Sequence, residues 1–333
     1  MATPLRSVCL IFRQPGRFFS IERIFQQLSP ILAQSLSVET TEMKYSRITI
    51  RGILANIRNA KARSADVYHV TGDVHYVVLG LPPRRTLLTI HDCVFLFSAA
   101  GLKRRVLKWL LLDMPVRRSR LITTISEATR KDILHFTGCA PDKVVVIPDP
   151  VSDTIHYSPA NFRNEEPVIL FMGTTDNKNL LRVAQALNGI SCRLEIVGQL
   201  NADQEQALAG HSIRYDQHTG LSNEQVAAAY ANADLVLFPS TFEGFGLPIV
   251  EAQQSGRPVI TSDLSPMKEV AGGAACLVDP YNVSAIREGV LKVISDAAYR
   301  EQLIRDGVRN VRRFSAPAIA AQYLECYKKL ANQ

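Results

Sequence analysis

Residues 235–256 read LVLFPSTFEGFGLPIVEAQQSG. The four apolar residues 235–238 are typical of a strand that helices cover on both faces. Pro248 is well suited to the first turn of a helix, and Gly256 can adopt the left-handed conformation that ends one. The stretch therefore predicts a buried parallel strand, a loop and a helix.

The loop of this stretch has the composition of a ligand site. Gly244 and Gly246 have no Cβ, so the backbone can approach a ligand closely. The start of the following helix offers unpaired N–H groups and a positive dipole end, which suit a diphosphate. Glu243 and Glu251 are suited instead to accepting hydrogen bonds from hydroxyls. A GxGxxG dinucleotide fingerprint is absent, because Ile249 stands at its third glycine position.

Apolar runs of similar length recur along the chain, separated by longer amphipathic stretches. They are SVCLIF (7–12), DVYHV (66–70), TLLTIHD (86–92), LITTIS (121–126), KVVVIP (143–148), PVILFMG (167–173), RLEIVG (193–198), RPVITSD (257–263) and ACLVD (275–279). Strands that alternate with helices indicate βαβ units and parallel sheets, so the fold class is α/β.

Two prolines, Pro148 and Pro150, and the polar stretch 158–167 separate two alternating blocks. We therefore expect two doubly wound, Rossmann-like domains that face a central cleft. The expected boundaries are 1–151 for the N-terminal domain and 152–313 for the C-terminal domain. Residues 314–333 are expected to form a helix that packs back toward the N-terminal domain.

The composition excludes several classes of protein. Of the 333 residues, 47% are hydrophobic and 21% are charged, which is ordinary for a globular chain. The six cysteines form no CxxC pair, so neither a zinc site nor a disulfide framework is indicated. No apolar run approaches the roughly 18 residues of a membrane-spanning helix. The N-terminus lacks the features of a signal peptide. A cytoplasmic location is therefore expected.

The positive charge lies in the first half of the chain. Residues 1–151 hold 22 Lys and Arg against 11 Asp and Glu, whereas the remainder holds 16 against 20. The stretch 102–120 is especially basic and contains Trp109, the single tryptophan. Two interpretations stay open: peripheral contact with an anionic membrane, or a solvated basic surface. No nucleic-acid-binding motif accompanies the charge.

The stretch 223–259 resembles glycosyltransferase family 4, the retaining enzymes with the GT-B fold. The resemblance rests on residues 223–225, 230, 233–234, 238–240, 243–248, 251–252 and 256–259, and extends to 126–127, 147–148 and 173–179. It implies an enzyme of the hexosyltransferase type that moves a sugar from a nucleotide-sugar donor to a glycan or lipid-linked acceptor. Cell-surface polysaccharide or lipopolysaccharide biosynthesis, at the inner face of the membrane, is the corresponding expectation.

The resemblance also implies roles for residues of the second half. Glu243 would contact hydroxyls of the donor sugar, and Glu251 those of the ribose. Backbone amides of 244–247 (Gly244, Phe245, Gly246 and Leu247) would hold the sugar and the diphosphate. Lys178, in the turn that begins at Gly173, would contact the diphosphate. The family often has an arginine in this turn, where Thr174 and Asn177 stand here, so Arg182 is a candidate substitute.

Three residues of the first half complete the candidate site. His91 follows an apolar run and matches a family histidine that approaches the donor sugar. Asp92 beside it would orient His91 or contact the acceptor. Gly16 stands where the family has a glycine-rich acceptor loop, although the second glycine is missing. His69 and His75 are interpreted as structural.

No metal or other cofactor is expected, because the chain contains no Asp-x-Asp pair that could hold a divalent ion against a diphosphate. Lys178 and the helix dipoles would neutralise the charge instead. The alternatives are a non-catalytic subunit that binds sugar nucleotides and a GT-B sugar-nucleotide epimerase. The intact set of Glu243, His91, Lys178 and Glu251 favours the enzyme over the subunit.

Overall fold

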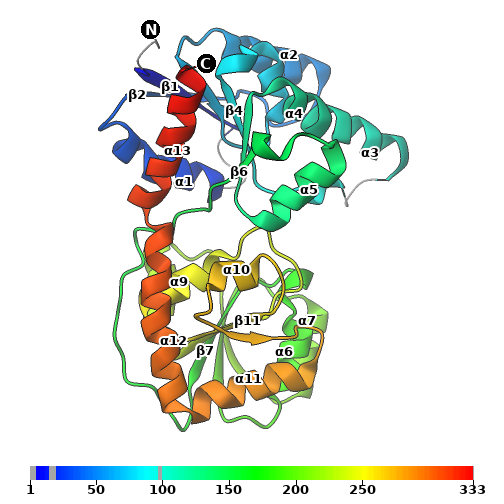
Figure 1. Cartoon of the computed structure of the whole chain (residues 1–333). Coiled ribbons are helices and arrows are strands. Elements are labelled where there is room, and N and C mark those ends of the chain that lie inside the picture. Colours follow the sequence, from blue (N-terminus) through cyan, green and yellow to red (C-terminus); the bar gives the residue numbers. More distant parts are fainter. Residues whose placement is uncertain (1–4, 15–19, 97–99, 333) are drawn as a thin grey trace. The chain divides into compact units, whose positions relative to one another are not determined.

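The computed structural model describes residues 5–14, 20–96 and 100–332 of the chain. The chain forms two compact units, which we treat separately. Unit 1 comprises Met1–Pro150 and Ala316–Gln333, and unit 2 comprises Val151–Ser315 (Figure 1). The boundaries expected from the sequence, 151/152 and 313/314, lie one and two residues from these.

Unit 1 contains a six-stranded parallel sheet with the order β2-β1-β3-β4-β5-β6. Its strands are β1 Ser7–Phe12, β2 Ser37–Glu42, β3 Val67–Val70, β4 Thr86–Ile90, β5 Leu121–Thr124 and β6 Val144–Val146. Its helices are α1 Ser20–Leu32, α2 Ile50–Lys61, α3 Gly101–Lys108, α4 Met114–Arg118, α5 Glu127–Thr137 and α13 Ala316–Ala331.

Both faces of this sheet are buried. Along β1, Val8 and Leu10 pack with α1 and α13 on one face, whereas Cys9 and Ile11 belong to the cluster on the other face. A strand covered on both faces buries nearly every side chain, which explains the continuous apolar run 8–12. The strand order places the topological switch point of this sheet between β1 and β3.

Unit 2 contains a second six-stranded parallel sheet, with the order β12-β11-β10-β7-β8-β9. Its strands are β7 Val168–Met172, β8 Arg193–Val197, β9 Arg214–His218, β10 Leu235–Phe238, β11 Val259–Ser262 and β12 Cys276–Val278. Its helices are α6 Leu180–Leu187, α7 Ala202–Gly210, α8 Asn223–Asn232, α9 Leu247–Ser255, α10 Met267–Ala271, α11 Val283–Ser295 and α12 Ala297–Asn310.

The hydrophobic core of unit 2 lies between one sheet face and the helices α6, α7 and α11. Helices α8 and α9 pack against the opposite face, where they contact β7, β10 and β11. The order of this sheet is that of a Rossmann fold, and its switch point lies between β7 and β10. The expected α/β class with two doubly wound, Rossmann-like domains is confirmed. Among the described residues, no helix meets the length and apolarity needed to cross a membrane.

Two strands, β2 and β9, lie outside the apolar runs that marked the others. Their sequences are SVETTE and RYDQH, and both strands lie at a sheet edge. Edge strands face solvent and carry polar side chains, so their hydrophobic signal is weak. The basic stretch 102–120 also differs from one regular helix, because a π-helical turn, Trp109–Asp113, separates α3 from α4.

Helix α13 belongs to unit 1, although all of unit 2 precedes it in the sequence. It packs beside α1 (Figure 1). His69 of β3 lies fully buried beneath it, where Nδ1 is 2.7 Å from the Tyr327 hydroxyl and Nε2 is 2.6 Å from Thr89 Oγ1. The rings of Phe25 and Tyr323 pack against the imidazole. Burial lowers the pKa of His69 to about 3, with the nearby His91 charge as a smaller cause.

Because His69 is neutral when buried, we expect the stability of unit 1 to fall in acid. A histidine that titrates near 6.5 when unfolded and near 3 when folded binds a proton first in the unfolded chain. Its contribution to stability is therefore complete above pH 6.5 and is lost progressively as the pH falls toward 3. We expect the free energy of unfolding to fall by about 2 kcal/mol from this residue between pH 7 and about pH 5.

Urea unfolding followed by the fluorescence of Trp109 measures this effect, because the single tryptophan lies in unit 1. His69→Gln should be less stable at pH 7 but should lose less stability on acidification than the wild type. His135→Gln changes an exposed histidine of the same unit and is the matched control. An equal pH dependence of His69→Gln and the wild type would contradict the prediction.

Candidate functional site

The candidate site of unit 2 lies at the switch point of its sheet. Strands β7 and β10 are direct neighbours, with Leu235 opposite Ile169 and Val236 opposite Leu170. Because the two strands are parallel, the loops that follow them leave from the same edge. Residues 173–179 and 239–246 therefore come together, although 59 residues separate them in the sequence. Ligands of open α/β sheets bind at such an edge.

The first loop is shaped around Lys178. Gly173 has a φ of +85°, and a Cβ at this position would lie 2.9 Å from Lys178 Cε. Glycine thus permits both the backbone conformation and the close passage of the lysine side chain. Asn179 follows with a φ of +72°, and its side-chain amide donates to the carbonyls of Pro239 and Pro280 at 3.1 and 2.7 Å. These bonds tie the loop to the ends of β10 and β12.

Lys178 and Glu243 form an ion pair at the centre of the site. The distance between Lys178 Nζ and Glu243 Oε1 is 2.5 Å, and the two side chains are 16% and 13% exposed. Asn177 supports the carboxylate, because its Nδ2 donates to the carbonyl of Phe242 at 2.8 Å and to Glu243 Oε1 at 3.3 Å. The ammonium group of Lys178 also lies over the Phe238 ring, 4.7 Å from its centroid. Cation and carboxylate are thus both held by well-packed neighbours.

The second loop leads into α9 as the sequence predicts. Gly246 precedes the helix with a φ of +107°, Pro248 is in its first turn, and Gly256 ends it with a φ of +78°. The first N–H groups of a helix have no partner within it, and the dipole makes this end positive. The backbone at 244–247 is therefore suited to an anionic group, with the Lys178–Glu243 pair beside it.

Glu251 lies one turn inside α9, where Tyr230 of α8 donates a hydrogen bond to its Oε2 at 2.7 Å. Burial raises the pKa of Glu251, and the hydrogen bond from Tyr230 partly opposes this rise. The tyrosine orients the carboxylate and uses one of its acceptor positions. The remaining positions can accept from hydroxyl groups of a ligand.

Arg182 lies in the first turn of α6. Its guanidinium donates to Asn179 Oδ1 at 3.0 Å and lies 5.6 Å from the centroid of the Tyr281 ring. Thr174 and Asn177 occupy the two positions where the family often has arginine, and both form hydrogen bonds here. Thr174 donates to the carbonyl of Gln199 at 2.6 Å, and Asn177 donates to Glu243. Lys178 is thus the cation that the structure brings to Glu243.

The candidates of unit 1 lie at the end of β4. His91 is 9% exposed, and its Nε2 is 2.9 Å from the carbonyl oxygen of Thr71, which follows β3. Asp92 accepts from the backbone N–H of Val94 at 2.9 Å in a local turn. Gly16 lies outside the described residues. Buried Asp149 is a further carboxyl group of this unit. Its burial raises its pKa to about 6, and the charge of His91 opposes the rise.

Sequence reasoning did not identify four supporting residues. Asn177 and Asn179 lie in the predicted turn 173–179 and Tyr230 belongs to the resemblance, but the sequence assigns none of them a supporting role. Asp149 stands between the two prolines of the expected domain junction. Asn179 does carry a detectable signal, because asparagine favours the left-handed conformation between a turn and a helix. The described residues contain no group of three or more His, Cys, Asp or Glu side chains that could hold a metal ion.

Comparison with protein families assigns both halves of the chain. The family described as "Glycosyl transferases group 1" matches residues 154–309, and "Glycosyltransferase Family 4" matches residues 13–154. The resemblance to family 4 is confirmed by these matches.

Curated relatives share up to about a third of the aligned residues. The O-antigen chain mannosyltransferase B of Escherichia coli is 29% identical over 241 residues, covering 64% of this chain and 61% of the relative. The MMP alpha-(1->4)-mannosyltransferase of Mycolicibacterium hassiacum is 30% identical over 246 residues, covering 68% and 59%. The chain thus spans about three fifths of the length of these curated relatives.

Solved structures share the fold at low identity. Sucrose-phosphate synthase from Thermosynechococcus elongatus superposes with a TM-score of 0.77 at 17% identity, covering 98% of this chain and 99% of that one. Anabaena HepE in complex with UDP and glucose has a TM-score of 0.75 at 16% identity, covering 96% and 98%. These likenesses establish the GT-B fold.

The Lys178–Glu243 pair predicts a characteristic pattern of ligand affinity. Lys178→Ala should weaken the binding of UDP or GDP by about 1.5–3 kcal/mol, the range for hydrogen bonds to charged groups. The loss includes repulsion from Glu243, which would be left without its cation. Glu243→Gln should therefore bind the diphosphate at least as well as the wild type. The double variant should bind it more tightly than Lys178→Ala alone.

Calorimetric titration with nucleoside mono- and diphosphates measures these affinities. Monophosphate binding should change much less in Lys178→Ala, because it lacks the second phosphate. Arg182→Ala is the matched control, since it removes a cation bound to Asn179 rather than to Glu243. Equal losses for mono- and diphosphate, or a larger loss in Arg182→Ala, would show that Lys178 does not contact the diphosphate.

Proposed function

Because the chain belongs to the group 1 glycosyltransferases of family 4, we propose that it transfers a hexosyl group from a nucleotide-sugar donor to an acceptor hydroxyl. The observation that carries the proposal is the Lys178–Glu243 pair beside the start of α9, at the switch point of the second sheet. The pair combines a cation for phosphate with a carboxylate for hydroxyls. A nucleotide-sugar presents both chemical groups next to each other.

The donor would lie along this edge of unit 2. Its diphosphate would accept hydrogen bonds from the amides of 244–247 and from Lys178, whose ammonium has three N–H donors and gives one to Glu243. Glu243 would accept a hydrogen bond from a hydroxyl of the sugar. Glu251, which Tyr230 orients, would accept one from the ribose. The structure of HepE in complex with UDP and glucose supports a donor of this kind. We also propose that His91 contacts the donor sugar.

We further propose that the anomeric configuration is retained and that no metal ion takes part. The acceptor oxygen would form its bond to C1 on the face from which the bond between C1 and the phosphate oxygen breaks. The departing diphosphate oxygen would take the acceptor proton, so that a protein base is not required. Lys178 and the dipole of α9 would stabilise the charge that develops on the diphosphate.

The acceptor is proposed from the relatives. One is named for the O-antigen chain, and a structural neighbour, WaaG, is described as involved in lipopolysaccharide biosynthesis. WaaG covers 96% of this chain at a TM-score of 0.72 and 14% identity. We therefore propose a role in bacterial cell-surface polysaccharide or lipopolysaccharide biosynthesis, with a glycan or lipid-linked acceptor.

A basic and apolar surface on α3 supports contact with an anionic membrane at its cytoplasmic face. Leu102, Val106 and Trp109 are spaced as neighbours on one helix face, and their exposed fractions are 76%, 52% and 53%. Lys103 and Arg105 are exposed on either side of this face. Apolar residues flanked by cations are the composition of a helix that lies in the membrane interface.

The Glu243→Gln variant tests the enzymatic proposal. Its carboxylate is a charged contact that would strengthen in the transition state, so we expect turnover to fall by about two orders of magnitude with folding intact. Sugar transfer to a defined glycan acceptor, measured after a donor screen, gives the turnover. Nuclear magnetic resonance of the product reports the anomeric configuration, which should match that of the donor.

The same assay distinguishes the alternatives. Activity should persist in excess EDTA; a loss that manganese or magnesium reverses would contradict metal independence. A non-catalytic subunit would bind nucleotides without transfer or donor turnover. An epimerase would convert the donor without an acceptor. Wild-type turnover in Glu243→Gln would remove this residue from the site.

Vesicle sedimentation tests the membrane contact. We expect binding to vesicles that contain phosphatidylglycerol but not to pure phosphatidylcholine. Each cation near an anionic surface contributes about 1 kcal/mol, so Lys103→Gln/Arg105→Gln should bind roughly 30-fold more weakly. Arg84→Gln/Arg85→Gln removes two exposed cations elsewhere in unit 1 and should bind like the wild type. Equal binding by both double variants would contradict a role for α3.

A further inference from the structure

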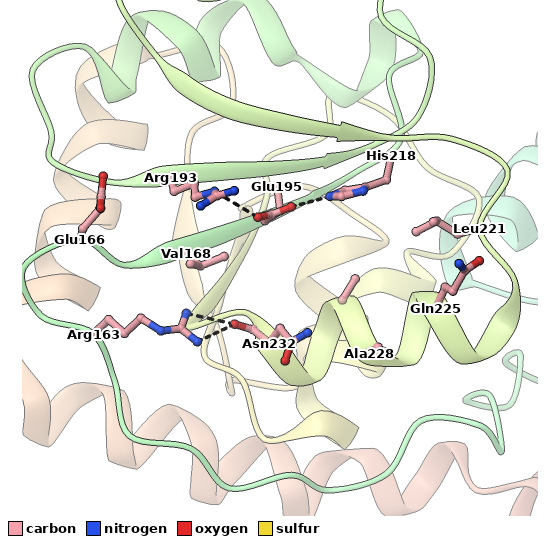
Figure 2. A pocket seen from close by; sticks show the side chains of 11 residues that line it. Arg163, Glu166, Val168, Arg193, Glu195, His218, Leu221, Gln225, Ala228 and Asn232 are labelled. Atoms are coloured by element: carbon pink, nitrogen blue, oxygen red, sulfur yellow. Dashed lines mark hydrogen bonds and ion pairs between the residues drawn. The ribbon is translucent and has the colours of Figure 1, made fainter.

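A second cavity lies in unit 2 on the face of the sheet beside α8. It has a volume of about 640 Å³ and lies between β7, β8 and β9 on one side and α8 on the other (Figure 2). We call it the sheet groove and define it by Arg163, Arg193, Glu195, His218, Ala228 and Asn232. The volume is in the range of pockets that bind small molecules. Lys178, Glu243 and Glu251 do not line it.

The alternation of β8 creates the groove. Leu194 and Ile196 point into the core beneath α6 and α7, so Arg193 and Glu195 point to the opposite face. On α8, the wall facing these residues includes the small side chain of Ala228, which leaves space above the strands (Figure 2). Ala229 also lines the groove. A sheet face that only supported a helix would carry apolar residues here, as the other face does.

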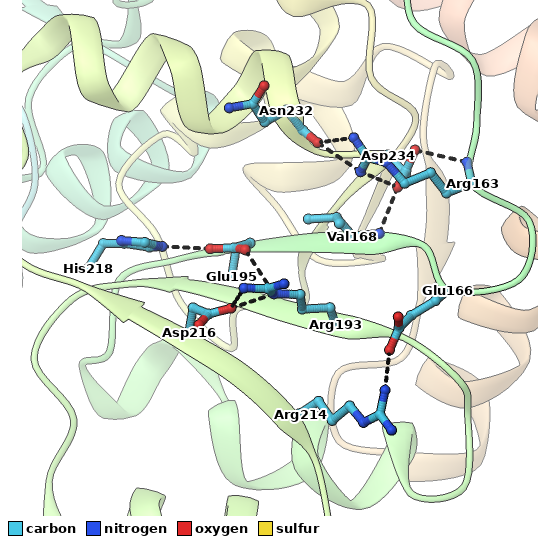
Figure 3. A network of polar contacts seen from close by, with 10 residues as sticks. All are labelled: Arg163, Glu166, Val168, Arg193, Glu195, Arg214, Asp216, His218, Asn232 and Asp234. Carbon is cyan, nitrogen blue, oxygen red and sulfur yellow. Dashed lines mark hydrogen bonds and ion pairs between the residues drawn. The ribbon is translucent and has the colours of Figure 1, made fainter.

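The charged side chains of the groove are held in place by ion pairs. Glu195 Oε2 is 2.5 Å from His218 Nε2, and Arg193 bridges Glu195 and Asp216 of the neighbouring strand (Figure 3). Arg163 lies at the other end of the groove. These pairs fix the orientation of each polar group, so a ligand would not have to order them.

Arg163 is anchored in the same manner. It donates to Asp234 Oδ2 at 2.9 Å and, through two nitrogens, to the carbonyl of Asn232 at 3.1 Å each (Figure 3). About half of the Arg163 and Arg193 side chains and 41% of the His218 side chain remain exposed. The groove thus presents donors and acceptors that already have partners within the protein.

These existing contacts determine which class of ligand the groove can bind. A charged ligand would have to compete with existing ion pairs, whereas a neutral polyhydroxylated ligand can add hydrogen bonds without disturbing them. Val168, Leu221 and Ala228 add apolar surface for the C–H faces of sugar rings. We propose that the sheet groove binds a short neutral oligosaccharide, separately from the donor site. Such a site would hold a growing glycan near the enzyme and raise its effective concentration. The proposal goes beyond sugar transfer itself.

Calorimetric titration with α-linked mannotriose and with maltotriose tests the proposal, with trigalacturonic acid as a charged counterpart. We expect millimolar binding of at least one neutral trisaccharide and weaker binding of the charged one. Ala228→Trp would fill the groove and should lower the affinity for the neutral ligand by at least about tenfold. Ala209→Trp places the same side chain on an exposed alanine of α7 and is the matched control.

Glu195→Gln supplies a second variant, because it replaces the carboxylate that orients Arg193 and His218 with a neutral amide. It should also weaken binding of the trisaccharide. Binding of UDP and GDP should be unchanged in all three variants, which separates this proposal from the proposed donor site. The proposal is overturned by absence of neutral trisaccharide binding, by full binding in Ala228→Trp, or by tighter binding of trigalacturonic acid. Failure of nucleotide binding in the wild type would instead count against the donor site.

Discussion

The parallel pairing of β7 and β10 is the constraint on which the candidate site depends. These strands are neighbours in the sheet but are separated in the sequence by two other strands, so their loops diverge and leave a space at one edge. Lys178 enters this space from one loop and Glu243 from the other. Asn179 ties the first loop to the carbonyl of Pro239 and thereby fixes the distance between them. The chemistry of the site is therefore a consequence of strand order.

The site also shows how one residue pair can serve two purposes. In the proposed function Lys178 and Glu243 would have separate tasks toward a nucleotide-sugar, yet they contact each other directly. A mutually paired cation and carboxylate are less costly to bury than either alone. The pair keeps both groups ordered, and a diphosphate that approached Lys178 would change the environment of Glu243. Under the proposed function, binding of the phosphate part and recognition of the sugar would be physically coupled.

Sequence reasoning recovered the features that depend on local patterns. The central strands follow from apolar runs, and α9 follows from Pro248 and Gly256. The edge strands β2 and β9 were missed, because a strand that faces solvent does not need an apolar sequence. The contact of Lys178 with Glu243 could not be derived either, since it depends on which strands become neighbours. Arg182 illustrates the same limit: its spacing from Lys178 fits a shared ligand, whereas its guanidinium binds Asn179.

Helix α13 has a consequence for the synthesis of the protein. The face of the first sheet that carries Val8 and Leu10 is covered partly by α13, whose residues are translated after all of unit 2. Unit 2 has a contiguous sequence and can fold as soon as it leaves the ribosome, because domains generally fold as units. Unit 1 keeps an apolar surface uncovered until α13 has been translated, although β1 is translated before all of unit 2. A nascent chain of this protein therefore completes its second domain before its first, and chaperones would meet it in that order.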